Sequence, residues 1–333
     1  MKDIRNYSLL AHNTFGIDAR CSRFLEYENE EEAVLVAQLL CQSDTPYIII
    51  GGGSNLLLTR DFDGIVVHAA MNSCDVQGLT MRCGSGMVWD DVVAQSLQHG
   101  LYGAENLSLI PGDVGASAVQ NIGAYGAEVK DLIVSVEAIE IQTGRKRIFS
   151  NAECEYGYRQ SRFKKDWKNQ YLITFVTYKF SDVFIPHIDY GNIRAELDHR
   201  AIVRPSAEQL RQVIIDIRNA KLPDPKVMGN AGSFFMNPVV SRQQFEALLQ
   251  QYPDMPHYHI DNDHEKIPAG WMIEQCGWKG KSLGPAGVHD RQALVLVNLG
   301  GATGADIVRL CQTIQHDVHT RFGITISPEV NII

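Results

Sequence analysis

The stretch 111–128 combines residue types that suit contact with a planar, uncharged part of a ligand. Six of the residues from 112 to 124 are glycine or alanine, and no charged residue falls within 114–127. Glycine and alanine allow a backbone to approach a flat or phosphorylated group closely, while Gln120 and Asn121 can form directional hydrogen bonds without charge. A helix and turn whose small residues only permit close packing is an equally good interpretation of these residues alone.

A second candidate for ligand chemistry follows a predicted buried strand. Residues 47–50 are β-branched or aromatic and are bounded by turn residues, which predicts a strand. The next five residues are Gly51, Gly52, Gly53, Ser54 and Asn55. Backbone N–H groups of such a turn can converge on phosphate oxygens, and the serine and asparagine add side-chain donors. A tight turn or β-bulge is the alternative, but three consecutive glycines exceed what one turn needs, so we favour a phosphate cradle.

This glycine turn matches neither of two common phosphate motifs. Leu56 stands where the third glycine of the dinucleotide fingerprint would be, and the lysine of a Walker motif is missing. The predicted cradle therefore belongs to another fold.

The elements that must position these stretches are short strands and amphipathic helices. We predict helices over 29–42, 89–98, 206–219, 241–251, 271–276 and 302–322. We predict strands over 47–50, 65–68, 80–84, 134–142 and 324–333. Residues 252–268 are predicted to form a loop, and the two prolines in 221–226 indicate a hinge or domain boundary. Short strands with few long helices are typical of an α+β fold.

Length and charge limit the kinds of protein that this chain can be. At 333 residues it exceeds the size at which one core usually stops growing, so two or three domains are expected. The net charge of -9 provides no basic surface for nucleic acid or for anionic lipid. We therefore expect neither nucleic acid nor a membrane as a partner.

Neither the start of the chain nor its cysteines indicate export. The first twenty residues include charged residues and lack a continuous apolar region, and no later run reaches about 18 apolar residues. The seven cysteines form no Cys-x-x-Cys pair, which suits neither a disulfide framework nor a zinc site. The histidines and aspartates of 257–264 lie in the predicted loop without orienting periodicity, so we expect no metal site there. A cytoplasmic protein is the expectation.

Taken together, the motifs resemble the UDP-N-acetylenolpyruvoylglucosamine reductase family. The resemblance rests on Gly-Gly-Gly-Ser-Asn after a strand, and on a later Pro-Gly followed by Gly-Ala-x-x-x-Gln-Asn-Ile-Gly-Ala-Tyr-Gly. The stretches 154–164 and 188–192 extend it, so that it spans nearly the whole chain. It implies an α+β chain with the FAD-binding fold of the vanillyl-alcohol oxidase type. The implied division is a first FAD-binding subdomain over 1–70, completed by 323–333, a second over 71–220, and an α+β substrate-binding domain over 221–322.

The resemblance also implies which residues hold the cofactor. In this family the first glycine loop holds the pyrophosphate of FAD, and the second motif lies along the ribityl chain and the flavin. Non-covalent FAD is then expected to contact Gly51, Gly52, Gly53, Ser54, Asn55, Pro111, Gly112, Gly115, Ala116, Gln120, Asn121, Gly123, Ala124, Tyr125 and Arg159.

Three residues match the catalytic positions of the family. Arg159 is expected beside the pyrimidine edge of the flavin, Ser233 as a proton donor, and Glu329 as a carboxyl group near the substrate. The positions implied for substrate binding are Tyr158, Tyr190, Lys221, Asn237, Tyr258, Lys279, His289 and Gln292. Tyr190 assigns the chain to the first of the two family types. Met236 departs from the lysine expected there in close relatives, which leaves the diphosphate contact of that lysine open.

The implied activity is a two-stage reduction. NADPH, as co-substrate, reduces FAD; a hydride then reaches C3 of the enolpyruvyl group of the UDP-N-acetylglucosamine ether, and Ser233 protonates C2. The product is UDP-N-acetylmuramate, a peptidoglycan precursor, and we expect a monomeric enzyme. Two alternatives stay open: another FAD-linked oxidase or dehydrogenase of the same fold, and a non-enzymatic nucleotide-binding protein.

Overall fold

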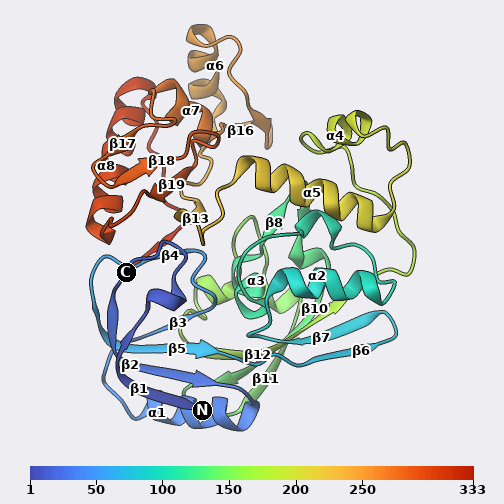
Figure 1. Ribbon diagram of the computed structural model, residues 1–333, viewed down its shortest axis with the longest axis vertical. Coiled ribbons are helices and arrows are strands. Elements are labelled where there is room, and N and C mark those ends of the chain that lie inside the picture. Colours follow the sequence, from blue (N-terminus) through green and yellow to red (C-terminus); the bar gives the residue numbers. More distant parts are fainter. The chain divides into compact units, whose positions relative to one another are not determined.

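The computed structural model describes residues 1–333, and these form two compact units (Figure 1). The first unit comprises Met1–Tyr7, Cys21–Gly52 and Asp63–Ala220. The second comprises Ser8–Arg20, Gly53–Phe62 and Lys221–Ile333. Both contain helices and mixed or antiparallel sheets, which confirms the predicted α+β class. Each unit is built from segments that are far apart in the sequence.

A four-stranded sheet carries the strand that leads into the first glycine turn. Its order is β1 (Lys2–Ser8), β2 (Arg20–Tyr27), β5 (Phe62–Ala69) and β3 (Tyr47–Ile50). Strand β3 pairs in parallel with β5, so that Ile50 lies opposite His68. The register therefore puts His68 beside the residue that directly precedes the glycines.

An antiparallel five-stranded sheet forms the centre of the first unit. Its order is β11 (Lys146–Ser150), β10 (Ile133–Glu140), β12 (Tyr171–Lys179), β7 (Thr80–Gly84) and β6 (Cys74–Gln77). Alternate residues of β12 face opposite sides, as the period of a strand requires. Val176 and Tyr178 pack in the core that includes Trp89 of α2 (Trp89–Gln98), whereas Phe175, next to Val176, packs in the core of α1 (Glu30–Cys41). Both faces of the sheet are thus covered.

One cross-strand pair of this sheet consists of two cysteines. Cys74 of β6 lies opposite Cys83 of β7, with the two sulfur atoms 3.7 Å apart. At the next pair, the Gly84 N–H donates to the Ser73 carbonyl, so the cysteines occupy a position without ladder hydrogen bonds. Side chains are closest at such positions.

Helices and small strands complete the first unit. These are α3 (Val114–Gln120), the hairpin of β8 (Gly123–Ala124) and β9 (Ala127–Glu128), α4 (Ile193–His199) and α5 (Ala207–Lys221). Helices α2 and α5 run alongside each other (Figure 1), and the Arg211 guanidinium of α5 makes two contacts, of 2.7 and 3.0 Å, with the Asp90 carboxylate of α2. Short 3-10 helices of this unit cover Glu105–Leu107, Val129–Asp131, Ala152–Cys154 and Arg162–Lys164, and Leu10–His12 forms one in the second unit.

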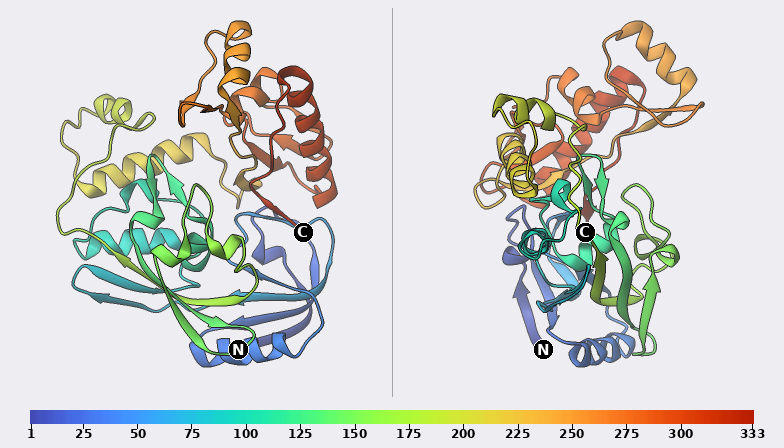
Figure 2. Two further views of the ribbon diagram at one scale, coloured as in Figure 1. Left: turned by 180° about the vertical axis from the view of Figure 1, so that it is seen from behind. Right: turned by 90° about the vertical axis from the view of Figure 1, so that its right-hand side faces the viewer.

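The second unit has three sheets and three α-helices. One sheet has the order β13 (Gly229–Ser233), β19 (Val295–Asn298), β18 (Ala286–Val288) and β17 (Ser282–Leu283). Another has the order β14 (Val239–Ser241), β16 (His264–Lys266) and β15 (Tyr258–His259). The helices are α6 (Arg242–Gln251), α7 (Ala269–Gln275) and α8 (Gly304–Phe322), and α8 runs beside β18 and β19 (Figure 2). In the third sheet, β4 (Leu56–Leu57) pairs in parallel with β20 (Asn331–Ile332).

Helix α8 shows how the sequence sets helix ends. Thr303 and Asp306 form a reciprocal capping box at its start, and Gly323 ends it with a φ of 65°. Such caps satisfy backbone groups that have no partner within the helix. None of the helices is long and apolar enough to cross a membrane.

Several predicted elements are confirmed, and two predictions are wrong. Strands β3 and β7 and helix α2 have the predicted bounds at both ends, and the other predicted helices begin and end within two residues of the prediction. The predicted terminal strand 324–333 is reduced to β20 and to a single bridge between Pro328 and Phe235. Pro328 has no N–H to extend this pairing into a longer ladder, and Ile324 and Ile326 are buried without strand partners. The predicted loop 252–268 contains the strands β15 and β16. They are two and three residues long and mostly polar, so the sequence shows no alternation of apolar and polar residues there.

Candidate functional site

The stretch 111–128 folds as a helix, a left-handed cap and a tight hairpin. Helix α3 ends at Asn121, which adopts a φ of 47°. Three backbone hydrogen bonds tie the start of the stretch to the first unit. The Trp89 N–H donates to the Gly112 carbonyl at 2.9 Å, the Val114 N–H to the Met87 carbonyl at 2.8 Å, and the Gly115 N–H to the Ser85 carbonyl at 2.9 Å. The second motif is therefore a rigid element on the five-stranded core.

The first glycine turn lies directly against this second motif. A Cβ atom on Gly51 would lie 3.0 Å from Cβ of Ala116, and one on Gly52 would lie 3.0 Å from Oδ1 of Asp113. Such distances leave no room for a side chain without a shift of the neighbours. The two segments that the sequence singles out thus meet on one surface of the first unit.

Asn121 and Arg159 together support the backbone between α3 and the hairpin. The buried Asn121 amide donates to the Gly157 carbonyl at 2.8 Å, and its carbonyl oxygen accepts from the Lys130 N–H at 3.1 Å. The Arg159 guanidinium donates to the carbonyl groups of Asn121 and Gly123. A fixed cation therefore borders this segment, and it also lies 5.4 Å from the centre of the Tyr158 ring.

The hairpin turn and the segment with Tyr190 are held together. The turn consists of Tyr125 and Gly126, with φ values of 48° and 80°. A Cβ atom on Gly126 would lie 3.3 Å from Cδ2 of Tyr190, so the half-exposed Tyr190 ring lies over the turn. Asn106 joins both segments, since its buried amide donates to the carbonyl of Tyr125 at 2.9 Å and to that of His187 at 3.0 Å.

In the second unit, Gly53 and strand β13 share one connecting residue. The Thr14 N–H donates to the Gly53 carbonyl at 3.2 Å, and the Thr14 hydroxyl donates to the Asn230 carbonyl at 2.6 Å. The Asn230 N–H in turn donates to the Thr14 carbonyl at 2.9 Å. Thr14 thereby links the end of the glycine turn to the strand that ends at Ser233.

Ser233 and Glu329 are brought together by backbone pairing. The Glu329 N–H donates to the Phe234 carbonyl at 2.8 Å, and the Met236 N–H donates to the Ser327 carbonyl at 2.9 Å. The Asn55 amide also donates to the Glu329 carbonyl at 3.3 Å. The second unit therefore gathers the serine, the glutamate and the last residue of the glycine turn in one place.

The remaining residues implied for substrate binding occupy several parts of the second unit. The Asn237 side chain accepts a hydrogen bond of 2.9 Å from the Ala269 N–H at the start of α7. His289 is buried, and burial lowers the pKa of its imidazole. Gln292 lies in the turn that follows, where its side chain accepts a hydrogen bond of 3.4 Å from a backbone N–H. These three residues come from segments that border α7 and the sheet of β13.

Lys221, Tyr258 and Lys279 lie at other positions. Lys221 is the exposed last residue of α5. Tyr258 lies on β15, where the Lys266 ammonium group is 5.5 Å from the ring centre. Lys279 donates to the Glu274 carboxylate at 2.9 Å. The contacts within the unit do not join these three side chains to Ser233.

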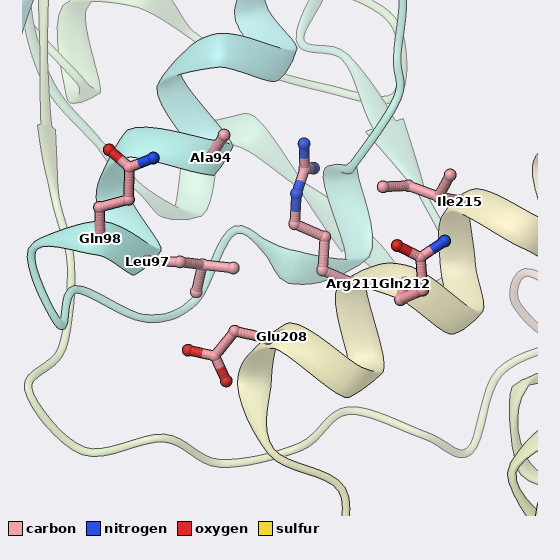
Figure 3. Close-up of a pocket in the computed structure, with 7 residues that line it drawn as sticks. All are labelled: Ala94, Leu97, Gln98, Glu208, Arg211, Gln212 and Ile215. Atoms are coloured by element: carbon pink, nitrogen blue, oxygen red, sulfur yellow. The ribbon is translucent and has the colours of Figure 1, made fainter.

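A pocket in the first unit lies away from the residues implied by the sequence. It has a volume of about 300 Å³ and lies between α2 and α5 (Figure 3). The side chains around it are those of Ala94, Leu97, Gln98, Glu208, Arg211, Gln212 and Ile215. None of the implied cofactor, substrate or catalytic residues is among them, so this pocket is not the candidate site.

The histidines of the segment 257–264 serve a structural purpose. Nδ1 of His257 and of His259 lie 3.1 and 3.0 Å from the two oxygens of the buried Glu265 carboxylate. No group of three histidine, cysteine or acidic side chains is arranged to hold a metal ion.

Four residues that hold the segments of the candidate site in place were not predicted from the sequence. Asn106 and Thr14 hold the segments described above, and His68 and Asp113 form an ionic contact of 3.6 Å beside the glycine turn. Asp113 stands inside the second motif, where a charge among small neutral residues could have been noticed. The others are single polar residues whose partners are remote in sequence.

The arrangement fits a flavin dinucleotide. Two glycine-rich segments meet through the small side chain of Ala116 and the carboxylate of Asp113, and the guanidinium of Arg159 is fixed on the second segment. Backbone donors with an adjoining cation suit a ligand with an anionic pyrophosphate and a planar ring.

Comparison with family models divides the chain into two matched regions. Residues 22–148 match a model described as FAD binding domain. Residues 224–333 match a model described as UDP-N-acetylenolpyruvoylglucosamine reductase, C-terminal domain. Each region contains one part of the site: Gly51 and the second motif lie in the first, and Ser233 and Glu329 lie in the last.

Proteins named UDP-N-acetylenolpyruvoylglucosamine reductase are similar over nearly the whole length. The one from Bacteroides fragilis is 53% identical over 335 residues, which covers 99% of each chain. The one from Burkholderia multivorans is 44% identical, covering 97% of this chain and 95% of the relative. The crystal structure of the UDP-N-acetylenolpyruvylglucosamine reductase from Thermus caldophilus has a TM-score of 0.69 at 21% identity, and covers 99% of this chain and 98% of that chain, which shows a shared fold.

Proposed function

The chain belongs to the UDP-N-acetylenolpyruvoylglucosamine reductase family, and from this premise we propose how its residues carry out the reaction. It is an FAD-dependent oxidoreductase that reduces the enolpyruvyl group of a UDP-N-acetylglucosamine ether in peptidoglycan synthesis. NADPH is the proposed source of the hydride, and UDP-N-acetylmuramate is the product. The proposal deals with the roles of individual residues.

The observation that carries the proposal is the pairing of residues 234–236 with 327–329. The Glu329 N–H donates to the carbonyl of Phe234, the residue after Ser233, over 2.8 Å. A hydroxyl and a carboxyl group that approach one reacting centre are what a hydride addition followed by protonation requires.

For the cofactor, the proposed contacts are the glycine turn and the second motif. Gly51, Gly52, Gly53, Ser54 and Asn55 would hold the pyrophosphate through backbone and side-chain donors. Pro111, Gly112, Gly115, Ala116, Gln120, Gly123, Ala124 and Tyr125 would line the ribityl chain and ring. Because the Asn121 side chain is already engaged by Gly157 and Lys130, we assign it to shaping this segment rather than to contacting the ligand. When bound without a covalent link, FAD supplies the hydride chemistry that side chains lack.

The chain's own catalytic work concerns charge and one proton. Addition of a hydride to C3 of the enolpyruvyl group puts negative charge on C2 and on the adjoining carboxylate. Arg159 would stabilise negative charge on the flavin ring. Glu329, as a protonated acid, would stabilise the negative charge on the substrate carboxylate, and the Ser233 hydroxyl would donate the proton to C2. A serine is a weak acid, but a carbanion-like carbon is the stronger base, so the transfer is favourable.

The proposed substrate contacts divide between two tyrosines of the first unit and a set of mostly polar residues that would hold the nucleotide. Tyr190, half-exposed over the Tyr125 turn, would cover the bound substrate as in the first type of the family, with Tyr158 beside it. The proposed polar contacts are Lys221, Asn237, Tyr258, Lys279, His289 and Gln292. Met236 can supply no charge, so binding of the diphosphate must depend on other residues. We further infer that the enzyme acts as a cytoplasmic monomer.

Ser233→Ala provides the test, because the two half-reactions can be measured separately. Stopped-flow absorbance of the flavin should show reduction by NADPH at a near-normal rate. Reoxidation by the enolpyruvyl sugar nucleotide should be slower by at least about a hundredfold, the low end for loss of a general acid. Ser282→Ala, an exposed serine of the same unit, is the matched control and should alter neither rate.

The same measurement separates the alternatives. An equal loss in both half-reactions of Ser233→Ala would remove the proton-donor role. A wild-type protein whose flavin is bleached by NADPH but not restored by the sugar nucleotide would be another oxidoreductase of this fold. A protein that binds nucleotide without turnover of NADPH would be non-enzymatic.

A further inference from the structure

A chain of buried charges in the first unit ends at the first glycine turn. Nδ1 of His68 on β5 lies 2.9 Å from Oε2 of Glu26 on β2, and Nε2 of His68 lies 3.6 Å from Oδ2 of Asp113. The side chains of Glu26, His68 and Asp113 are only 6%, 14% and 10% exposed. Two carboxylates therefore share one imidazole that is largely removed from water.

This geometry favours the doubly protonated form of the imidazole. A neutral histidine has one N–H and one bare nitrogen, and a bare nitrogen facing a carboxylate is repulsive. Burial alone would lower the pKa of His68, but Asp113 and Glu26 outweigh it and hold the pKa above its ordinary value. Within this unit the charged groups facing His68 are Glu26 from β2 and Asp113 from the segment before α3, and Lys2 of β1 pairs with the other oxygen of Glu26.

Asp113 brings the charge chain into contact with the glycine turn. Its Oδ1 atom would lie 3.0 Å from a Cβ atom on Gly52, and its Oδ2 atom 3.3 Å from one on Gly51. Its backbone begins α3 and forms a bridge with Val88. The carboxylate therefore packs one glycine-rich segment onto the other.

A carboxylate beside the glycine turn lowers the affinity for a phosphate ligand through electrostatic repulsion. The turn beginning at Gly51 is the proposed cradle for the FAD pyrophosphate, and like charges that are poorly solvated repel. An imidazolium on the far side of the carboxylate neutralises it without occupying the cradle. Asp113 can then pack the turn at little electrostatic cost only while His68 is protonated.

We propose that His68 is a positioning residue for cofactor binding: held between Glu26 and Asp113, it neutralises the carboxylate that packs the Gly51–Gly52 turn. The inference rests on the proposed use of FAD. It makes FAD affinity depend on pH, because the imidazole loses its charge as the pH rises through its raised pKa. Affinity for FAD is then highest on the acidic side of this pKa and falls above it.

The test is a double-mutant cycle on FAD binding by flavin-free protein, measured by quenching of flavin fluorescence between pH 6 and 9. At pH 7, His68→Gln should raise the Kd at least about tenfold, which is about 1.4 kcal/mol. Asp113→Asn should bind at least as tightly as wild type and should show a flat pH profile, since asparagine is also a good residue for a helix start. The double variant should return to within about threefold of wild type, because the charge that needed neutralising is gone.

Two comparisons keep the outcome decisive. His99→Gln, an exposed histidine of the same unit, should leave both the Kd and its pH profile unchanged. Thermal unfolding of the flavin-free variants reports any loss of folding, which His68→Gln and the double variant would share if His68 were merely structural. If the double variant binds as weakly as His68→Gln, or if His68→Gln binds like wild type, the inference is overturned. If wild-type protein fails to bind FAD, it is the proposed function that fails.

Discussion

Replacement of Gly53 by alanine tests whether the glycine turn is required by the fold of the protein itself. Gly53 has a φ of 67°, and a Cβ atom there would lie 2.0 Å from the His12 carbonyl oxygen and 2.8 Å from Cα of Asn13. These are backbone atoms, so no side-chain rotation can relieve the overlap. The turn or the segment 12–14 must move by about an ångström to reach an ordinary contact.

The expected cost can be assembled from the contacts that such a movement breaks. A left-handed alanine costs about 1 to 2 kcal/mol relative to glycine. The Thr14 N–H donates to the Gly53 carbonyl at 3.2 Å, and losing this hydrogen bond costs about 1 kcal/mol more. We therefore expect Gly53→Ala to lower the free energy of unfolding by about 2 to 3 kcal/mol.

Gly323→Ala is the matched control. Gly323 lies in the same unit with a φ of 65°, and nothing lies within 4 Å of its Cβ position. It should show the left-handed cost of about 1 to 2 kcal/mol alone. Chemical denaturation of flavin-free protein gives both values, and flavin absorbance per purified protein should fall for Gly53→Ala only. Equal destabilisation by the two substitutions would refute the steric reasoning.

Two further perturbations act on the five-stranded sheet of the first unit. Burial raises the pKa of Glu137, but hydrogen bonds from Arg82 and Lys146 outweigh it and hold this pKa below its ordinary value. A carboxyl group whose pKa is lower in the folded state stabilises that state at pH values above its unfolded-state pKa, and this stabilisation is lost as the pH falls. In thermal melts below about pH 5, wild type should therefore lose stability more steeply than Glu137→Gln. Parallel curves of melting temperature against pH for the two proteins would contradict this. The sulfur atoms of Cys74 and Cys83 lie 3.7 Å apart, so hydrogen peroxide should oxidise the two thiols to a disulfide. A thiol titration of the unfolded protein should then find two fewer than the seven thiols of the sequence. Loss of one thiol or none would show that this disulfide cannot form.

The sequence was most informative where local rules decide the structure. The bounds of β3, β7 and α2 follow from β-branched runs and from polar helix starts, and the structure agrees with them. The resemblance was carried by motifs of consecutive residues, which the matches to a flavin-binding domain and to the reductase C-terminal domain support. The strands β1 and β2 were not predicted, because β1 is mostly polar and exposed, and the run of buried residues at the end of β2 does not alternate with exposed ones.

The division of the chain into units could not be deduced from the order of residues. The segments 8–20 and 53–62 belong to the second unit, although they are surrounded in the sequence by segments of the first. Their place is set by contacts with remote residues, such as that of Thr14 with Asn230 and that of Asn55 with Glu329. No periodicity or composition reports a contact across more than two hundred residues. The predicted three-part division, and the site roles assigned by resemblance, stay predictions.

The glycine turn shows what a composition pattern can and cannot say. Three consecutive glycines predict that something lies very close to the backbone, and this is what the structure contains. The neighbours on the Cβ side are Ala116 and Asp113 for Gly51 and Gly52, and the His12 backbone for Gly53. The glycines are therefore needed first for packing against protein, and only the opposite side of the turn is left for a ligand. Asn121 is a second example, since its side chain joins the end of α3 to Gly157 and Lys130 by hydrogen bonds. A motif can thus mark a binding site correctly while many of its residues serve to build the surface that binds.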